Sequence, residues 1–306
     1  MFSFANKTIT NQKIDLPILK KKKIDLFIKR EDLIHNIISG NKFRKLKYNI
    51  LELKKLRKRQ IITFGGAFSN HLYACAYLGY TNKIKTIGII RGEELEFAEL
   101  NYNLKQCRKF GMELIFISRN EYKERNNLKY QKFLLNKFDR SYLIPEGGTN
   151  DLGVLGCQEI LKENDKYFDS ICCPVGSGGT ISGLINESKE TQIVIGFSAL
   201  KSSGVEKVIN GFVTKKNWKI YQDDLFGGYS KIDEKLVSFI NDFFRNYKIL
   251  LDPIYNSKML YKIISLINNN NHDFGKKILM INTGGLHSIK GINQKLSKKG
   301  CSIINQ

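Results

Sequence analysis

The chain has 306 residues, of which 42% are hydrophobic and 26% charged, and its formal net charge is +21. These proportions are ordinary for a globular protein, and the length suits one large or two modest α/β domains. No stretch approaches the roughly 20 consecutive apolar residues of a membrane-spanning helix. The first residues lack the pattern of a secretory signal, so we expect a cytoplasmic protein with no membrane partner.

The positive charge is scattered along the sequence. Its densest runs are Lys20–Lys23 and Lys54–Arg59, and the second run ends a predicted helix, whose dipole favours cations there. No zinc finger, RNA-binding aromatic motif or heptad array accompanies the charge. We therefore expect a solvated basic surface and no nucleic-acid partner.

The six cysteines form no CxxC pair and no Cys/His spacing typical of a metal site, so we expect no metal. Cys172 and Cys173 lie in the apolar run Ile171-Cys-Cys-Pro-Val175, which predicts a buried strand. A free cysteine in such a run behaves as a small buried hydrophobe.

Short apolar runs alternate with amphipathic segments along nearly the whole chain. Strands are predicted at residues 24–28, 60–64, 86–90, 113–117, 141–144, 170–175, 193–197 and 277–281. Helices are predicted at 42–59, 69–78, 97–110, 122–138, 151–162, 180–188, 233–247 and 257–268. The first helix rests on the spacing of Phe43, Leu46, Ile50, Leu53 and Leu56. This alternation predicts an α/β fold of doubly wound parallel sheets, in which ligands bind beyond the carboxyl ends of the strands.

Paired glycines follow four of the predicted strands. They occur in the loops Gly65–His71, Pro145–Asn150, Gly176–Thr180 and Asn282–Gly285. Glycine lets the backbone approach a ligand closely, so four such loops at strand ends indicate a binding site.

The loop Gly176-Ser-Gly-Gly-Thr180 joins a strand to a helix, so its amide N–H groups can converge on an anion. No Gly-Lys-[Ser/Thr] follows, which excludes a Walker A loop. Ile181 stands where a dinucleotide fingerprint needs its third glycine. A phosphate monoester fits this loop, and a tight turn without a ligand is the alternative.

A second anion site is predicted at Ser69-Asn70-His71, which open a helix after a Gly-Gly turn. Ser69 is also a natural N-cap, so a capped helix without a ligand is the alternative. Two helix N-termini suggest two anions, a cofactor phosphate and a substrate carboxylate. Lys42 follows Ser39-Gly-Asn at another helix start, where the positive terminus favours the neutral amine that attacks an aldehyde. Taken alone, and as one of 50 lysines and arginines, Lys42 fits an ordinary surface lysine better than a catalytic one.

Seven motifs in order give the chain a resemblance to a known family. It resembles the 1-aminocyclopropane-1-carboxylate (ACC) deaminase/D-cysteine desulfhydrase family of fold-type-II pyridoxal-phosphate (PLP) enzymes, from about Lys29 to Gly291. The motifs are Lys29-Arg-Glu-Asp-Leu33, Gly40-Asn-Lys-Phe-Arg-Lys-Leu46, Ser69-Asn-His71, Ile144-Pro-Glu-Gly-Gly-Thr-Asn150, Gly176-Ser-Gly-Gly-Thr180, Leu251-Asp-Pro-Ile-Tyr255 and Thr283-Gly-Gly-Leu286.

The resemblance implies a role for each matching residue. Lys42 would hold PLP as a Schiff base, and Asn70 would hydrogen-bond its phenolic oxygen. Asn256 or Thr283 would meet the pyridine nitrogen. The phosphate would lie in a cradle made of Gly176, Ser177, Gly178, Gly179 and Thr180.

On the substrate side, the resemblance implies that the backbone amides of Ser69, Asn70 and His71 hold the carboxylate, with the Ser69 hydroxyl near the reacting carbon. Tyr229 and Tyr255 would be the acid/base groups, and the alternative for both is an aromatic residue packed in the core. The family also implies a large domain at 1–47 and 149–306, a small domain at 48–148 inserted into it, and a homodimer.

The residue after Tyr255 bears on the choice of substrate. In the ACC deaminases that this chain resembles, a glutamate at this position keeps the pyridine nitrogen protonated, and here it is Asn256. A neutral partner suits β-elimination better than the opening of a cyclopropane ring. We therefore expect α,β-elimination of D-cysteine to pyruvate, ammonia and sulfide, with ACC deamination as the alternative.

Other interpretations stay open. Asn256 also departs from the hydroxyl residue of the desulfhydrases, and Phe68 departs from the Ile/Gln-type residues found in better-known members. These differences leave room for another small amino acid, such as D-serine or β-chloroalanine. A protein of a different class, a non-catalytic PLP carrier or basic-surface binding protein, would need Lys42 and the phosphate cradle but not Ser69, Tyr229 and Tyr255.

Overall fold

The computed structural model describes residues 8–198, 204–222, 225–228 and 231–306. Its described residues form two compact units. One unit is Lys42–Gly156, and the other is Cys157–Gln306 together with the segment that ends at Asn41. The small domain predicted at 48–148 falls within the first unit, and its description as an inserted domain stays a prediction. Each unit has its own sheet and is described by itself.

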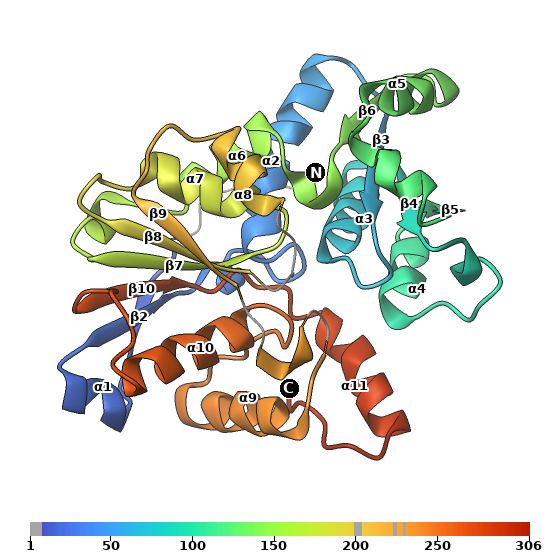
Figure 1. The fold of residues 1–306 in the computed structure, drawn as a ribbon. Coiled ribbons are helices and arrows are strands. Elements are labelled where there is room, and N and C mark those ends of the chain that lie inside the picture. The colour runs from blue at the N-terminus through green and yellow to red at the C-terminus, as the bar shows by residue number, and fades with distance from the viewer. Residues whose placement is uncertain (1–7, 199–203, 223–224, 229–230) are drawn as a thin grey trace. The chain divides into compact units, whose positions relative to one another are not determined.

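The smaller unit is built on a four-stranded parallel sheet with the order β5-β4-β3-β6 (Figure 1). Its strands are β3 (Gln60–Gly65), β4 (Lys85–Arg91), β5 (Met112–Ile117) and β6 (Ser141–Ile144). Its helices are α2 (Asn41–Lys55), α3 (Asn70–Asn82), α4 (Tyr102–Lys109), α5 (Leu128–Lys137) and α6 (Asp151–Gln158), of which the first and last extend into the other unit. Phe64 shares an apolar cluster with Leu134 of α5, whereas Gly65 lies against Leu72 of α3. Helices therefore cover both faces of the sheet, because successive strand residues point to opposite sides.

The larger unit contains a six-stranded sheet with the order β1-β2-β10-β7-β8-β9 (Figure 1). Its strands are β1 (Asn11–Ile14), β2 (Asp25–Lys29), β7 (Ser170–Val175), β8 (Ile193–Ser198), β9 (Trp218–Gln222) and β10 (Lys277–Ile281). Its helices are α1 (Pro17–Lys22), α7 (Gly179–Glu187), α8 (Val205–Asn210), α9 (Glu234–Tyr247), α10 (Asn256–Asn268) and α11 (Ser288–Lys298). Cys172 belongs to the apolar cluster that includes Leu260 of α10, and Cys173 to the cluster that includes Leu184 of α7. Both faces of this sheet are covered as well.

The predicted α/β class with two doubly wound sheets is confirmed. All eight predicted strands are present, each within one residue of its predicted bounds. Strands β1 and β9 and helices α1, α8 and α11 were not predicted, and β1 pairs with β2 in antiparallel fashion at the sheet edge. β1 (Asn-Gln-Lys-Ile) and β9 (Trp-Lys-Ile-Tyr-Gln) escaped prediction because edge strands bury little, and their polar residues hide the apolar pattern.

Five predicted helices differ from the structure by four or more residues at one end. The helix predicted at 69–78 continues to Asn82, and the helix predicted at 151–162 stops at Gln158. The helix predicted at 42–59 stops at Lys55, because Arg57 has a left-handed φ of 52°, and Leu56 is exposed, so its assignment to the apolar face was wrong. The helix predicted at 97–110 begins only at Tyr102, where the side chain of Asn101 accepts a hydrogen bond from the Leu104 amide at 2.9 Å. The segment predicted at 122–138 is interrupted by Asn127, which caps α5.

Short 3-10 turns connect several of these elements. They are η1 (Glu31–Leu33), η2 (Glu93–Leu95), η3 (Glu121–Asn126), η4 (Glu146–Gly148), η5 (Glu163–Asp165) and η6 (Leu225–Gly227). Across the residues that the structure describes, no helix is both long and apolar enough to span a membrane.

A buried ion pair fixes the start of the larger unit. Lys29, at the end of β2, places its Nζ 2.6 Å from Oδ2 of Asp165, and both side chains are almost fully buried. Asp165 also accepts hydrogen bonds from the Asn11 side chain at 2.7 Å and from the Lys162 amide at 2.8 Å. The carboxylate thus connects η5 to both β1 and β2.

We expect Lys29→Met to lower the free energy of unfolding by roughly 3–5 kcal/mol, because it leaves a buried carboxylate without its cation. Urea denaturation would measure the change. The double variant Lys29→Met/Asp165→Leu should recover part of the loss. The exposed pair Lys13–Asp25 offers a control, since Lys13→Met should change stability little. Equal losses in Lys29→Met and Lys13→Met would contradict the prediction.

Candidate active site

The glycine-rich loops lie at the carboxyl ends of the parallel strands. In the larger unit, Gly176–Thr180 follow β7 and Asn282–Gly285 follow β10. In the smaller unit, Gly65–Ser69 follow β3 and Pro145–Asn150 follow β6. Each sheet therefore gathers its loops at one edge, as the sequence predicted.

The segment Ser39–Asn41 is fixed on two of these loops. Ser39 Oγ accepts a hydrogen bond from the Gly285 amide at 3.1 Å, and the Asn41 amide donates to the Thr283 carbonyl at 3.3 Å. The Asn41 side chain donates to Thr180 Oγ1 at 2.9 Å. At Gly40 the φ angle is +60°, and a Cβ atom would stand 1.8 Å from the Thr283 carbonyl oxygen. Glycine is required at position 40, and the peptide bond after Asn41 leads directly to Lys42.

Lys42 and Lys45 converge on one carbonyl group in the smaller unit. Nζ of Lys42 donates to the Gly147 oxygen at 3.3 Å, and Nζ of Lys45 donates to the same oxygen at 3.0 Å and to Thr149 Oγ1 at 3.1 Å. Lys45 is buried. Lys45 was not among the predicted site residues, although its spacing of three residues from Lys42 places both on one face of α2.

A second set of contacts fixes the loop that carries Gly147. Glu146 accepts hydrogen bonds from the Tyr122 hydroxyl at 2.7 Å and from Arg125 Nε at 2.6 Å. Burial and the neighbouring carboxylate raise the pKa of Tyr122, so its hydroxyl stays protonated and donates. Gly147 has a φ of +69°, so the loop turns sharply after Glu146. This support could not be read from the sequence, because Tyr122 and Glu146 lie 24 residues apart.

The predicted phosphate cradle opens helix α7. Gly178 has a φ of +87° and precedes the first helical residue, so the amides of the first turn have no partner within the helix. A Cβ atom at Gly176 would lie 3.4 Å from the Tyr255 hydroxyl. The structure therefore brings Tyr255 beside the loop that we expect to bind phosphate. Ser177 is half-buried and Thr180 is buried, held by its contact with Asn41.

Ser69 caps α3 as predicted, with Oγ accepting a hydrogen bond from the Leu72 amide at 3.2 Å. The next residue, Asn70, has a buried side-chain oxygen that makes no hydrogen bond to any described residue. Buried polar atoms normally have partners, so an orphaned atom at a predicted cofactor contact fits a site built for a ligand. Phe68, before the cap, is half-buried.

The His71 side chain points into the core of the smaller unit. The Thr63 hydroxyl donates to the Ile144 carbonyl at 2.8 Å, so it must accept from His71 Nε2, also at 2.8 Å. Burial, followed by the charges of Lys42 and Lys45, holds the pKa of His71 well below its usual value of 6.5. His71 is therefore a neutral imidazole, and only its backbone amide remains a candidate for binding substrate.

The polar end of the site in the larger unit contains Asn256 and Thr283, both buried. The two N–H groups of the Asn256 carboxamide donate to Asp252 Oδ2 at 2.5 Å and to the Gly284 carbonyl at 3.2 Å. The Asn256 oxygen accepts from the Thr283 amide at 3.0 Å. Asn256 was predicted to donate a hydrogen bond to a cofactor nitrogen. Both N–H groups of its carboxamide already donate to other atoms of the protein.

Tyr229, the remaining predicted acid/base residue, lies outside the described residues. Its described neighbour Gly228 has a φ of +98°, and the Gly228 carbonyl accepts a hydrogen bond from the buried Lys258 Nζ at 2.7 Å. The chain that leads to Tyr229 is thus tied to α10.

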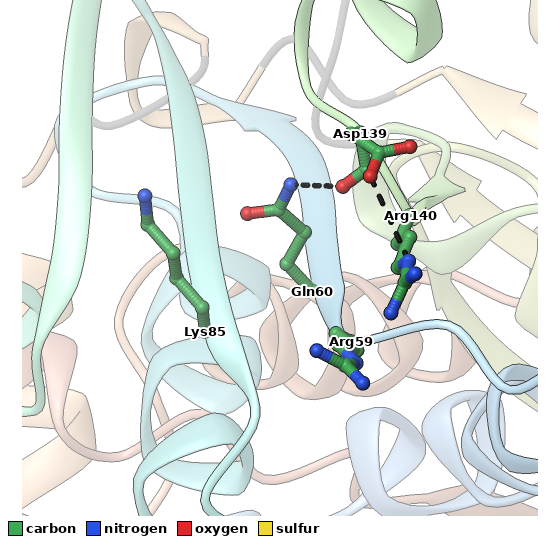
Figure 2. A pocket seen from close by; sticks show the side chains of 5 residues that line it. All are labelled: Arg59, Gln60, Lys85, Asp139 and Arg140. Carbon is green, nitrogen blue, oxygen red and sulfur yellow. Dashed lines mark hydrogen bonds and ion pairs between the residues drawn. The ribbon is translucent and has the colours of Figure 1, made fainter.

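A pocket of about 400 Å³ lies at the other edge of the smaller sheet, and Figure 2 shows the residues that line it. Gln60 and Lys85 are the first residues of β3 and β4, so this pocket lies at the amino ends of the strands. Its exposed charges are partly paired, Lys85 with Glu113 and Arg140 with Asp139. The pocket is lined by Arg59, Gln60, Lys85, Asp139 and Arg140, none of which belongs to a glycine-rich loop.

Comparisons with known proteins agree with this arrangement. A family model described as "Pyridoxal-phosphate dependent enzyme" matches residues 9–284. A Thermotoga maritima protein, provisionally named 1-aminocyclopropane-1-carboxylate deaminase, is 31% identical over 89% of this chain and 92% of its own length. The bifunctional D-cysteine desulfhydrase/1-aminocyclopropane-1-carboxylate deaminase of Arabidopsis thaliana is 29% identical over 93% of this chain and 78% of its own. A crystal structure of an ACC deaminase homologue superimposes with a TM-score of 0.79, at 26% identity, over 97% of this chain and 95% of that one.

We expect Gly40→Ala to weaken PLP binding by about tenfold or more, because the new methyl group displaces the segment that leads into Lys42. Titration of the apoprotein with PLP, followed by absorbance, would measure the affinity. Gly111→Ala is a matched control, since Gly111 also has a positive φ, of +83°, but a methyl group added there would meet no atom within 4 Å. Similar PLP affinities in the two variants would contradict the prediction.

His71 predicts a loss of stability in mild acid. Its pKa lies below the unfolded value of 6.5, so the unfolded chain takes up the proton first and folding weakens as the pH falls through that value. Urea denaturation at pH 8 and pH 5 should show a smaller loss in His71→Gln than in the wild type. If both proteins lost the same stability between pH 8 and pH 5, the acid sensitivity would come from groups other than His71.

Proposed function

Since the chain belongs to the pyridoxal-phosphate dependent enzymes, and among them to the ACC deaminase/D-cysteine desulfhydrase family, we propose that it is a lyase acting on D-cysteine. With one water molecule, D-cysteine would yield pyruvate, ammonia and hydrogen sulfide. The bifunctional Arabidopsis relative and a Klebsiella pneumoniae relative named D-cysteine desulfhydrase, 24% identical, support this substrate class.

Residues of several loops would hold the cofactor. Lys42 would carry it, Gly176–Thr180 would bind its phosphate, and Asn70 would meet its phenolic oxygen. The helix start at Gly178 and the orphaned Asn70 oxygen support these assignments. When bound, PLP supplies an electron sink that stabilises negative charge at the substrate α-carbon.

The substrate carboxylate would bind the amides of Ser69, Asn70 and His71 at the N-terminus of α3. The helix dipole favours an anion there. The neutral, buried His71 ring supports this assignment, because it holds the first turn in place without adding charge. The Lys42 amine would take the proton from the α-carbon, and its bond to the Gly147 carbonyl would orient it.

The Ser69 hydroxyl would lie near the reacting carbon as a second proton-transfer group. Its oxygen already accepts from the Leu72 amide, so it would act toward substrate chiefly as a donor. Tyr255 and Tyr229 would protonate the departing thiolate. The position of the Tyr255 hydroxyl beside Gly176 supports its place near the cofactor.

The choice of D-cysteine over ACC as the substrate rests on the neutral side chain of Asn256. It presents a carboxamide at the position where the ACC deaminases that this chain resembles have a glutamate, and its oxygen contacts Thr283 at the backbone amide. The groups at the ring-nitrogen end are therefore neutral. A ring without a charged partner is sufficient for the loss of a thiolate, which is a good leaving group.

ACC deamination to 2-oxobutyrate and ammonia is the second candidate. The Thermotoga maritima relative, 31% identical, carries that name. In that reaction the substrate has no α-proton, so a chain group would have to act on a ring carbon, and Ser69 and the two tyrosines are the candidates. A cytoplasmic homodimer is proposed on the family resemblance alone.

We expect the PLP-loaded protein to release pyruvate from D-cysteine faster than from L-cysteine, and to release little 2-oxobutyrate from ACC. Chromatographic identification of the 2-oxo acid would decide between the substrates. Lys42→Ala should abolish the product, because it removes both the attachment point and the base.

Lys47→Ala is a matched control from the same helix, since Lys47 is not among the residues assigned to the site. It should leave the rate close to that of the wild type. If ACC were the better substrate, the inference from Asn256 would be overturned. Activity that survives in Lys42→Ala would remove Lys42 from its proposed role.

A further inference from the structure

A buried carboxylate lies directly behind the ring-nitrogen end of the site. Asp252 is fully buried, and no ion pair to it is found among the described residues. Its oxygens accept four hydrogen bonds, from the amides of Ile254 at 3.0 Å, Tyr255 at 2.8 Å and Asn256 at 2.9 Å, and from the Asn256 side chain at 2.5 Å. Desolvation raises the pKa of Asp252, while these donors act in the opposite direction.

Asp252 fixes which way the Asn256 carboxamide faces. A carboxylate can only accept hydrogen bonds, and so can the Gly284 carbonyl at 3.2 Å, so the Asn256 NH2 group must face these two atoms. The Asn256 oxygen must then face the Thr283 amide, at 3.0 Å, and the Thr283 hydroxyl, at 3.4 Å. A flipped carboxamide would place its oxygen against two acceptors and its NH2 group against the Thr283 N–H.

Thr283 connects this arrangement to Lys42. Its carbonyl oxygen accepts the hydrogen bond from the Asn41 amide, one residue before Lys42. The Thr283 side chain is buried, and its only described hydrogen-bonding contact for the hydroxyl is the Asn256 oxygen. One chain of contacts therefore runs from the Asp252 carboxylate through Asn256 to the hydroxyl of Thr283.

We propose that Asp252 is a positioning residue of the cofactor site. It locks Asn256, whose oxygen holds the Thr283 amide, so that the Thr283 hydroxyl alone turns to donate to the pyridine nitrogen. The proposal rests on PLP binding as set out above, but not on the identity of the substrate. It reassigns Asn256 from a direct partner of the ring to the residue that orients the partner. It also places a carboxylate two hydrogen-bonded contacts away from the Thr283 hydroxyl, the neutral group that would meet the ring.

A simpler role for Asp252 is to stabilise the turn that leads into α10, which begins at Asn256. That role uses the hydrogen bonds that backbone amides donate to Asp252, and it acts on folding stability alone. The hydrogen bond that the Asn256 side chain donates to Oδ2 goes beyond this role. The two roles therefore differ in whether the bound cofactor senses the loss of the carboxylate.

The test compares Asp252→Asn, Thr283→Val and the double variant, each loaded with PLP. The readouts are the PLP dissociation constant, the absorption spectrum of bound PLP across a pH titration, and the melting temperature. We expect each single variant to weaken PLP binding by about tenfold and to shift the spectrum in the same direction. The double variant should be no worse than Thr283→Val, because both changes act through one contact.

Asp233→Asn is the matched control. Asp233 caps α9 by accepting from the Leu236 amide at 2.9 Å, and it is exposed. This variant should lower the melting temperature without changing the spectrum or the PLP affinity. If Asp252→Asn behaves in the same way, or if its effect on affinity multiplies with that of Thr283→Val, the proposal is overturned.

Should Asp252→Asn fail to fold, Asn256→Ala tests the same chain of contacts from its middle. Asn256→Ala should reproduce the spectral shift of Thr283→Val, and the double variant should show no larger shift. Thr283→Ser keeps the hydroxyl and should therefore have the wild-type spectrum. A wild-type spectrum in Asn256→Ala would refute the proposal. None of these readouts requires turnover, so a protein that binds PLP but ignores D-cysteine would disprove the proposed substrate and leave this test intact.

Discussion

The position of Lys42 depends on the close approach of two backbone segments. Gly40 lies against the Thr283 carbonyl so tightly that a single methyl group would not fit. Around this contact, Ser39 binds the Gly285 amide, and Asn41 binds both Thr283 and Thr180. The residue before Lys42 is thereby tied to the loops after β7 and β10. A lysine with four rotatable bonds can be placed reproducibly only if its backbone is held in this way.

Much of the fold follows from local patterns in the sequence. The core strands were found because β7, for example, is buried along its whole length, and its apolar run admits no other interpretation. Ser69 was correctly expected to cap its helix, since a cap is decided by residues three positions apart. Edge strand β9 and the exposure of Leu56 were not predicted, because both depend on the absence of packing neighbours, which a local pattern does not reveal.

The site residues also divide into those that local sequence reveals and those that depend on tertiary contacts. Lys42, Asn70 and the loop at Gly176 stand out through motif order, and the structure places them at helix starts and strand ends. Lys45, Glu146 and Asp252 lie within the same motifs, but no role followed from their positions there. Lys45 is recognisable only once the Gly147 carbonyl is known to receive two lysines, and Glu146 only once Tyr122 is known to reach it. Contacts between residues far apart in sequence decide the roles of Lys45 and Glu146. The role of Asp252 depends on how the Asn256 carboxamide faces Thr283 and Gly284, and composition and periodicity do not encode this either.

The boundaries between the two units fall inside helices. The first lies at the start of α2, between Asn41 and Lys42, and the second lies within α6, after Gly156. Neither crossing is an exposed linker rich in glycine or proline, where a protease would cut or a truncation would be tolerated. Cutting at these two points would remove Asn41 from the start of α2 and the last two residues from the end of α6. A fragment that begins at Lys42 would therefore lack the first residue of the helix that carries Lys42.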